Sequence, residues 1–272
     1  NEDREAVLEQ IKNDGVIGIL NCACSKTSLK TTNELTLKHD FIYGALGIHP
    51  SDAYDYNEEV KDEIIEKVKA NNKILAIGEI GLDYYWDENP DRETQKKVFR
   101  EQMELAKELN LPVVIHDRDA HKDTLDIMKE YPSVKGIVHC FSGSVEFAKE
   151  CVKLGYYIGI TGVVTFKNAK KIIEVVDAIP LDRLLVETDC PYMAPIPNRG
   201  KRNKSDYIEY IFSDNPLKKA LSGHVDQILC FLRDLPAGKG RRAVAVESAD
   251  VRAHIHADDV ALLQHPFAGD AV

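Results

Sequence analysis

The sequence predicts an α/β fold, a (β/α)₈ TIM barrel in which eight parallel strands are surrounded by helices. Two observations favour this fold class. Short apolar runs alternate with longer amphipathic segments, and strands separated by helices at this interval form a parallel sheet. The 272 residues are also close to the about 250 that such a barrel needs. A doubly wound open sheet is the alternative, but no G-x-G-x-x-G motif follows the first predicted strand.

Seven segments are predicted to be strands because each is a short apolar run, typical of a strand buried on both faces. They are residues 16–20, 41–48, 74–77, 112–115, 136–138, 156–160 and 184–186. Helices are predicted where longer segments mix apolar and charged residues with helical spacing. They are residues 4–14, 29–38, 58–71, 92–109, 122–129, 169–178 and 205–212. The first helix ends at the C-cap signal Asn13-Asp-Gly15 and has no strand before it. The first strand of the barrel is therefore expected before Asn1, missing from this chain.

The composition of the chain changes near its end. Residues 1–211 are predicted to form the barrel, and residues 212–272 an atypical tail. Through residue 211 there are 21 Lys and 7 Arg, but after it there are 3 Lys and 4 Arg, and the alternation of strands and helices stops. A join, a frameshifted end or a flexible tail would each produce this break.

The bulk composition is that of an ordinary globular protein, with 44% hydrophobic and 29% charged residues. No apolar run approaches the ~20 residues of a membrane span and the start is not a signal peptide, so a cytoplasmic protein is expected, with no membrane and no evident obligate protein partner. Six scattered cysteines predict reduced thiols rather than a disulfide framework or a zinc finger. The net charge of −10 argues against a broad basic surface for duplex nucleic acid, but bound metal ions could still attract a phosphate substrate.

Imidazoles and carboxylates follow several of the predicted strands. In parallel α/β folds the carboxyl ends of the strands line one face, which holds the active site. The residues at these positions include His49, Glu79, His116, Arg118, His139, Glu187 and Asp189. A single His at a strand end is usually a hydrogen-bonded core residue, whereas several such groups are satisfied together by a shared divalent cation. Mixed nitrogen and oxygen ligands suit Mn²⁺ or Zn²⁺, and Mg²⁺ where carboxylates dominate.

Glu79 is the predicted central ligand. It lies between Gly78 and Gly81 after an apolar run, where a buried acid needs a cation or strong hydrogen bonds, and where glycines let a bulky ligand approach. Its carboxylate could bridge two cations ~3.5–4 Å apart, which together activate a water molecule. Asp189 could orient that water or take its proton. Glu187 has two interpretations, a site residue or the partner of a helix lysine.

Five motifs resemble, in order, the TatD family of metal-dependent deoxyribonucleases within the amidohydrolase-like barrels. They are Gly47-Ile-His-Pro50, Ile77-Gly-Glu-Ile-Gly-Leu-Asp-Tyr84, Leu111-Pro-Val-Val-Ile-His116, Val138-His-Cys-Phe-Ser-Gly143 and Leu185-Val-Glu-Thr-Asp-Cys-Pro-Tyr192. The resemblance implies a metal-dependent hydrolase that cleaves DNA phosphodiesters with two divalent ions, often as a 3′→5′ exonuclease. We expect single-stranded or frayed DNA ends as the substrate, because the acidic net charge suits a short contact with DNA better than binding of a long duplex.

The same resemblance implies roles for individual residues. Glu79 would be the bridging ligand, His116 and His139 would bind one ion, and Asp189 would be a ligand that also contacts the attacking water. His49 and Arg118 would contact substrate.

The chain departs from the family pattern at both ends. Family members begin with a strand that carries His-x-His, and this chain starts after that position. A His-x-His motif does occur in the tail, at His254-Ile-His256. It could belong to a circularly permuted first strand, but we favour a coincidence. Two other functions therefore stay open: an amide or ester hydrolase on the same barrel, and a metal-depleted scaffold without catalysis.

Overall fold

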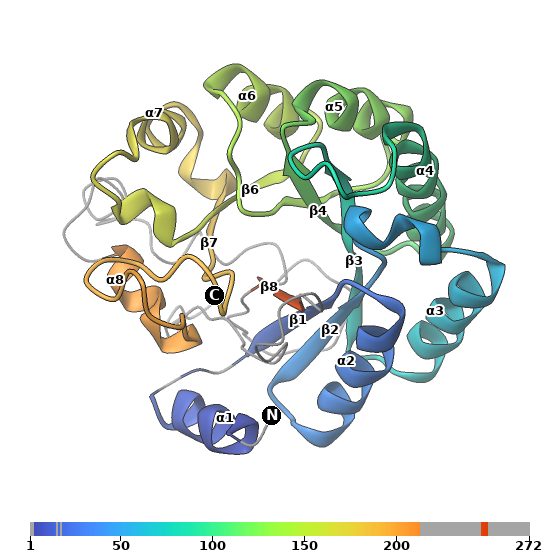
Figure 1. Cartoon of the computed structure of the whole chain (residues 1–272), viewed down its shortest axis with the longest axis horizontal. Coiled ribbons are helices and arrows are strands. Elements are labelled where there is room, and N and C mark those ends of the chain that lie inside the picture. The colour runs from blue at the N-terminus through green and yellow to red at the C-terminus, as the bar shows by residue number, and fades with distance from the viewer. Residues whose placement is uncertain (1–2, 15, 17, 213–245, 250–272) are drawn as a thin grey trace, which may run out of the picture.

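The computed structural model describes residues 3–14, 16, 18–212 and 246–249, which form a curled parallel sheet with helices around its outside (Figure 1). The eight strands are β1 Ile19–Ala23, β2 Ile42–Leu46, β3 Ile74–Asp83, β4 Val113–Arg118, β5 Gly136–Val138, β6 Tyr157–Ile160, β7 Leu184–Val186 and β8 Val246–Ala249. Their order in the sheet is β7-β6-β5-β4-β3-β2-β1-β8. Neighbours in sequence are therefore neighbours in space from β1 to β7, as in a (β/α)₈ barrel, and the predicted fold class is confirmed.

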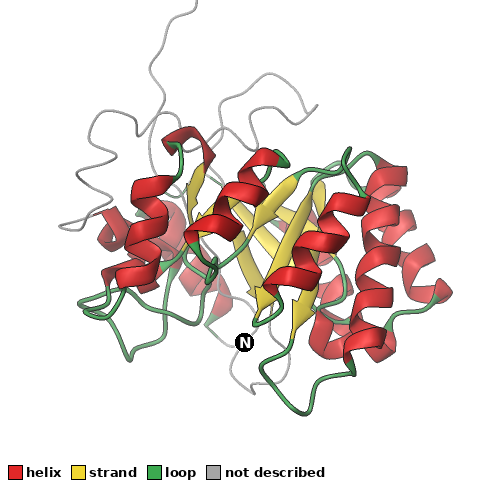
Figure 2. Cartoon of the chain, turned by 90° about the horizontal axis from the view of Figure 1, so that it is seen from above, coloured by secondary structure: helices red, strands yellow, loops and turns green. Residues whose placement is uncertain are grey.

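The helices pack in a ring outside the strands (Figure 1). Seen from above, they cover the outer face of the sheet (Figure 2). They are α1 Arg4–Asn13, α2 Lys26–Lys38, α3 Glu58–Ala70, α4 Arg92–Leu109, α5 His121–Glu130, α6 Val145–Lys153, α7 Lys170–Ala178 and α8 Ile208–Phe212. Short 3₁₀ helices lie at Pro50–Asp55, Gly162–Thr165, Leu181–Arg183 and Ser205–Tyr207. In the described residues, no helix combines the length and the apolarity needed to cross a bilayer.

Several elements differ from the prediction. The first strand is Ile19–Ala23 rather than residues 16–20, because Ile19 pairs with Ile42 and the register of the neighbouring strand sets its limits. Helix α6 was not predicted; it is only nine residues long and is capped by Ser144, whose hydroxyl accepts a hydrogen bond from the Phe147 amide. In so short a segment, the spacing of apolar residues predicts a helix only weakly.

Strand β3 is also longer than predicted and includes Glu79 and Asp83. The extension is possible because Gly81, with φ of +142°, has no side chain: a Cβ there would lie 2.0 Å from the carbonyl oxygen of His116 on β4. A glycine at this position lets the two backbones approach, so that the acids of β3 and the imidazole of β4 come together.

The tail contributes a strand where none was predicted. β8 runs parallel to β1, with Leu20 opposite Val246, on the side of β1 away from β2. An unpaired strand edge offers a row of backbone donors and acceptors, which a distant segment can satisfy whatever its own sequence rhythm. The proposed strand around His254 and His256 lies outside the described residues.

Candidate metal centre

The predicted site residues meet at the carboxyl ends of the strands. His49 follows β2, Glu79 lies on β3, His116 on β4, His139 directly after β5 and Asp189 after β7. All five line one cavity of about 830 Å³. A parallel sheet brings these residues together because every strand ends at the same edge.

Glu79 is at the centre of this group and is 1% exposed. Its Oε1 lies 2.9 Å from His116 Nδ1 and 3.9 Å from both His49 Nε2 and His139 Nε2. Burial alone would raise the pKa of Glu79, but these imidazoles outweigh it and hold the pKa far below its usual range. On the other side, Oε2 lies 3.7 Å from the Cys24 thiol. A buried carboxylate between several imidazoles therefore remains an anion.

The donor atoms of His49, Glu79 and His116 all lie within 4.8 Å of one another. This spacing lets the three residues converge on one ion with little movement, and imidazole and carboxylate are ligands of borderline divalent metals. The donor set therefore fits a metal ion. His49, which the sequence suggested as a substrate contact, is part of this group.

His116 is held between two carboxylates. Its Nδ1 faces Glu79, and its Nε2 lies 3.0 Å from Asp83 Oδ2. Burial alone would lower the pKa of His116, but the hydrogen bonds to Asp83 and Glu79 outweigh it and raise the pKa to about 9. Asp83 thereby fixes the orientation of the ring, as the outer partners of metal-binding histidines do.

His139 has an equivalent partner in Glu187. Its Nδ1 lies 2.7 Å from Glu187 Oε2, and its Nε2 lies 3.3 Å from Asp189 Oδ1. The other oxygen of Glu187 accepts a hydrogen bond of 2.6 Å from the Cys140 amide. Glu187 is thus a buried site residue, and the alternative of a helix-lysine partner is wrong. Gly159 makes room for it, since a Cβ there would lie 2.2 Å from Glu187 Oε1.

Two glutamines that the sequence analysis did not single out hold the strand ends. The Gln102 side chain accepts a hydrogen bond from the Ile48 amide and donates one to the Ile48 carbonyl, at 2.8 and 2.9 Å. Gln95 does the same for Asp83, at 2.9 and 3.0 Å. Both glutamines lie on the buried face of α4, seven residues apart. The sequence does contain a signal for them, because a polar residue on the apolar face of a helix must find a hydrogen-bond partner in the interior.

Arg118 lies on the wall of the cavity rather than among the imidazoles. Its guanidinium is 4.0 Å from the centre of the Tyr85 ring and 5.4 Å from that of Trp86. The predicted substrate contact is therefore held by aromatic rings near the mouth of the site.

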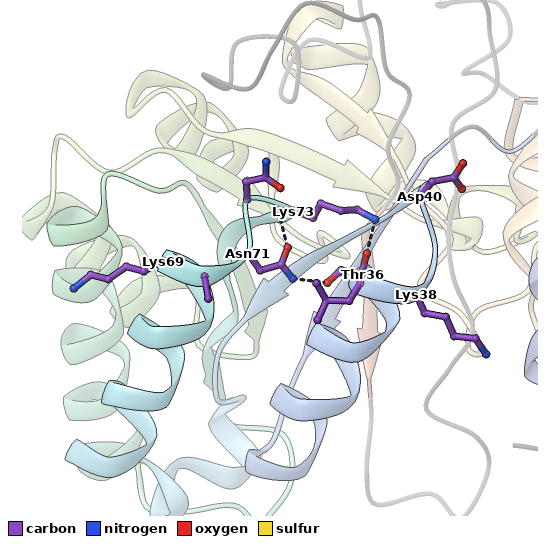
Figure 3. Close-up of a pocket in the computed structure, with 9 residues that line it drawn as sticks. Thr36, Lys38, Asp40, Lys69, Asn71 and Lys73 are labelled. Atoms are coloured by element: carbon purple, nitrogen blue, oxygen red, sulfur yellow. Dashed lines mark hydrogen bonds between the residues drawn. The ribbon is translucent and has the colours of Figure 1, made fainter.

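A second depression lies at the opposite end of the strands, between the end of α2 and the start of β3 (Figure 3). The Asn71 amide nitrogen donates to Thr36 Oγ1 at 2.8 Å, and the Lys73 ammonium donates to the Thr36 carbonyl at 2.5 Å. These groups satisfy one another and tie the helix to the strand. The residues of this depression therefore hold α2 against β3. The candidate metal ligands lie at the opposite, carboxyl end of the strands.

A comparison with known protein families finds a match over most of the barrel. The family model described as "TatD related DNase" matches residues 1–216. The chain belongs to the TatD family. A relative in Bacillus subtilis, named "Uncharacterized metal-dependent hydrolase YabD", is 49% identical over 211 residues, which cover 77% of this chain and 82% of that protein. The resemblance seen in the sequence is confirmed, and the protein is a metal-dependent hydrolase of this family.

Solved structures of TatD proteins have the same fold. The crystal structure of YjjV, a TatD homologue from Escherichia coli K12, has a TM-score of 0.74 at 30% identity and covers 84% of this chain and 92% of that one. A TatD-family hydrolase from Entamoeba histolytica has a TM-score of 0.70 at 28% identity, with 80% and 83% of the two chains covered.

Proposed function

We propose that this TatD-family hydrolase cleaves phosphodiester bonds of DNA and removes nucleotides from the 3′ ends of single-stranded or frayed substrates. The observation that supports it is the grouping of three imidazole nitrogens around one oxygen of the buried Glu79, in a cavity that also contains Arg118. A cavity lined by carboxylates would repel a phosphodiester unless bound cations reverse the local charge. The donor set suits two divalent ions, Mg²⁺ or Mn²⁺, with Zn²⁺ as the alternative.

In this proposal the residues of the chain have distinct roles. Two bound cations would neutralise the scissile phosphate and activate a water molecule as the nucleophile. Glu79 would be shared between the cations, and His116 and His139 would hold one of them. Asp189 would be a further ligand and would accept the proton of the attacking water. Arg118 would pair with a phosphate, since a guanidinium matches two phosphate oxygens at once.

The test is hydrolysis of a 5′-labelled single-stranded oligonucleotide by the full chain with Mg²⁺ or Mn²⁺, together with elemental analysis of the protein. We expect mononucleotides to be released from the 3′ end and about two metal ions to be bound per chain. Glu79→Gln should lower the rate by at least about a hundredfold. Loss of an outer partner of a metal ligand already costs up to about that much, and Glu79 is proposed as a ligand itself. Glu130→Gln is the matched control, because Glu130 is an exposed partner of Arg100.

Three results would contradict the proposal. Hydrolysis by Glu79→Gln at the wild-type rate would show that the Glu79 carboxylate is not needed for the reaction. Bound metal with cleavage of amide or ester substrates but not of oligonucleotides would favour the alternative hydrolase. The absence of bound metal would favour a scaffold.

A further inference from the structure

Large apolar side chains are exposed at the mouth of the metal centre. Among the described residues, seven large hydrophobic side chains are exposed: Leu37, Tyr54, Tyr85, Trp86, Tyr192, Met193 and Ile196. Trp86, Tyr192 and Met193 line the cavity of the metal centre, and Tyr85 contacts Trp86. Exposed apolar surface that gathers at one place on a protein marks a surface that a ligand covers.

The loop that carries Trp86 is anchored to the metal centre itself. The Tyr85 amide donates a hydrogen bond of 3.0 Å to Asp83 Oδ1, and the Asn89 side chain donates one of 3.2 Å to the Asp83 carbonyl. The other carboxylate oxygen of Asp83 contacts His116. The loop backbone that carries Trp86 is therefore held next to a partner of the candidate ligand His116, which suits a loop that positions substrate.

Trp86 is 49% exposed and meets Tyr85 edge to face, with ring centres 4.8 Å apart and planes at 89°. Arg118 lies against both rings, and in the described part of the chain no ion pair joins its guanidinium to a carboxylate. The guanidinium is thus held by the aromatic rings, and its positive charge is available to pair with an anionic ligand. An exposed indole beside an unneutralised guanidinium is the combination with which proteins bind single-stranded nucleic acid.

We propose that Trp86 is a stacking surface for one nucleobase of the substrate and that Arg118 holds the phosphate next to it. This subsite rests on the proposed nuclease function and provides a physical basis for its preference for single-stranded ends. A base in a duplex has its faces covered by its neighbours, whereas an unpaired base can lie on the indole. The site would therefore select unpaired nucleotides by their bases, without distinguishing strongly among base types.

The sequence provides a direct probe of this subsite, because Trp86 is the only tryptophan of the chain. The Mg²⁺-loaded full-length protein is titrated with a phosphorothioate oligothymidylate, whose linkages slow hydrolysis, while the intrinsic fluorescence is recorded. A parallel titration uses an oligonucleotide of the same length and linkage with abasic residues. We expect saturable quenching with the first and little with the second. Equal quenching by both would overturn the proposal.

Affinity measurements on variants provide the second test. Trp86→Ala should weaken binding of oligothymidylate by roughly tenfold, within the range measured when a stacking aromatic is removed, and should leave binding of the abasic oligonucleotide unchanged. Trp86→Phe should restore most of the affinity, because it keeps an aromatic face. Leu37→Ala is the control, since Leu37 is 67% exposed but lies in the depression at the opposite end of the strands.

The failure of this inference can be separated from failure of the nuclease proposal. If Trp86→Ala binds both oligonucleotides as the wild type does while 3′-end hydrolysis continues, the stacking subsite is refuted and the nuclease function stands. If the metal-loaded wild-type protein neither binds nor cleaves any oligonucleotide, both are refuted.

Discussion

Replacement of Glu187 by glutamine should impair metal binding although Glu187 itself is not a predicted ligand. The carboxylate accepts two hydrogen bonds through different oxygens, one from His139 Nδ1 and one from the Cys140 amide. A glutamine has only one acceptor oxygen, so it can accept only one of these two hydrogen bonds. If the amide nitrogen faces the imidazole, the ring proton moves to Nε2, the nitrogen that faces Glu79 and Asp189, and that nitrogen can no longer bind a metal. If the amide nitrogen instead faces the backbone N–H, two buried donors oppose each other.

The structure sets the size of the effect. The first outcome should weaken metal affinity by roughly 10–100-fold, as loss of an outer partner of a metal-binding histidine does. The second should lower the free energy of unfolding of the metal-free protein by about 1–3 kcal/mol, which is the cost of a buried unsatisfied group. Calorimetric titration with Mn²⁺ measures the first quantity, and urea denaturation in the presence of a chelator measures the second.

The same contact can be disturbed from the opposite side. In Gly159→Ala the new methyl group would displace Glu187 Oε1, which lies 2.2 Å from its position, so metal affinity should fall in this variant too. Glu130→Gln removes a carboxylate of the same type from an exposed pair with Arg100, and it should change stability by less than about 1 kcal/mol and leave metal affinity unchanged. Unchanged metal affinity and unchanged stability in both Glu187→Gln and Gly159→Ala would refute the reasoning.

Two further predictions concern the support of the site and its response to pH. Gln102→Leu should destabilise the protein by about 2–4 kcal/mol in urea denaturation, because it leaves both the amide and the carbonyl of Ile48 buried without their partner; a loss below about 1 kcal/mol would show that other groups replace it. In chelator, the stabilisation from His116 should be complete below its unfolded pKa of about 6.5 and should be lost as the pH rises through about 9, because its folded pKa is raised. Thermal denaturation from pH 6 to 10 should show this decline in the wild type and less of it in His116→Asn, and equal profiles would contradict the assignment.

The sequence determined which residues would meet. His49, Glu79, His116, His139 and Asp189 each stand at or near the end of an apolar run, and the runs alternate with helices. Such a pattern allows few arrangements other than a parallel sheet, in which all carboxyl ends share one edge. The convergence of these five side chains therefore follows from the order of strands and helices along the chain.

Tertiary structure decided how these residues are held. That Glu187 pairs with His139 depends on the spacing between β5 and β7, and that Gln102 supports the strand before His49 depends on the rotation of α4. The pairing of β8 with β1 depends on an edge being open to a segment more than 200 residues away. Periodicity along a chain encodes which face of an element is buried, but not which polar atom of a distant element will lie opposite it. Only the packed structure, in which each buried donor must find an acceptor, makes that choice.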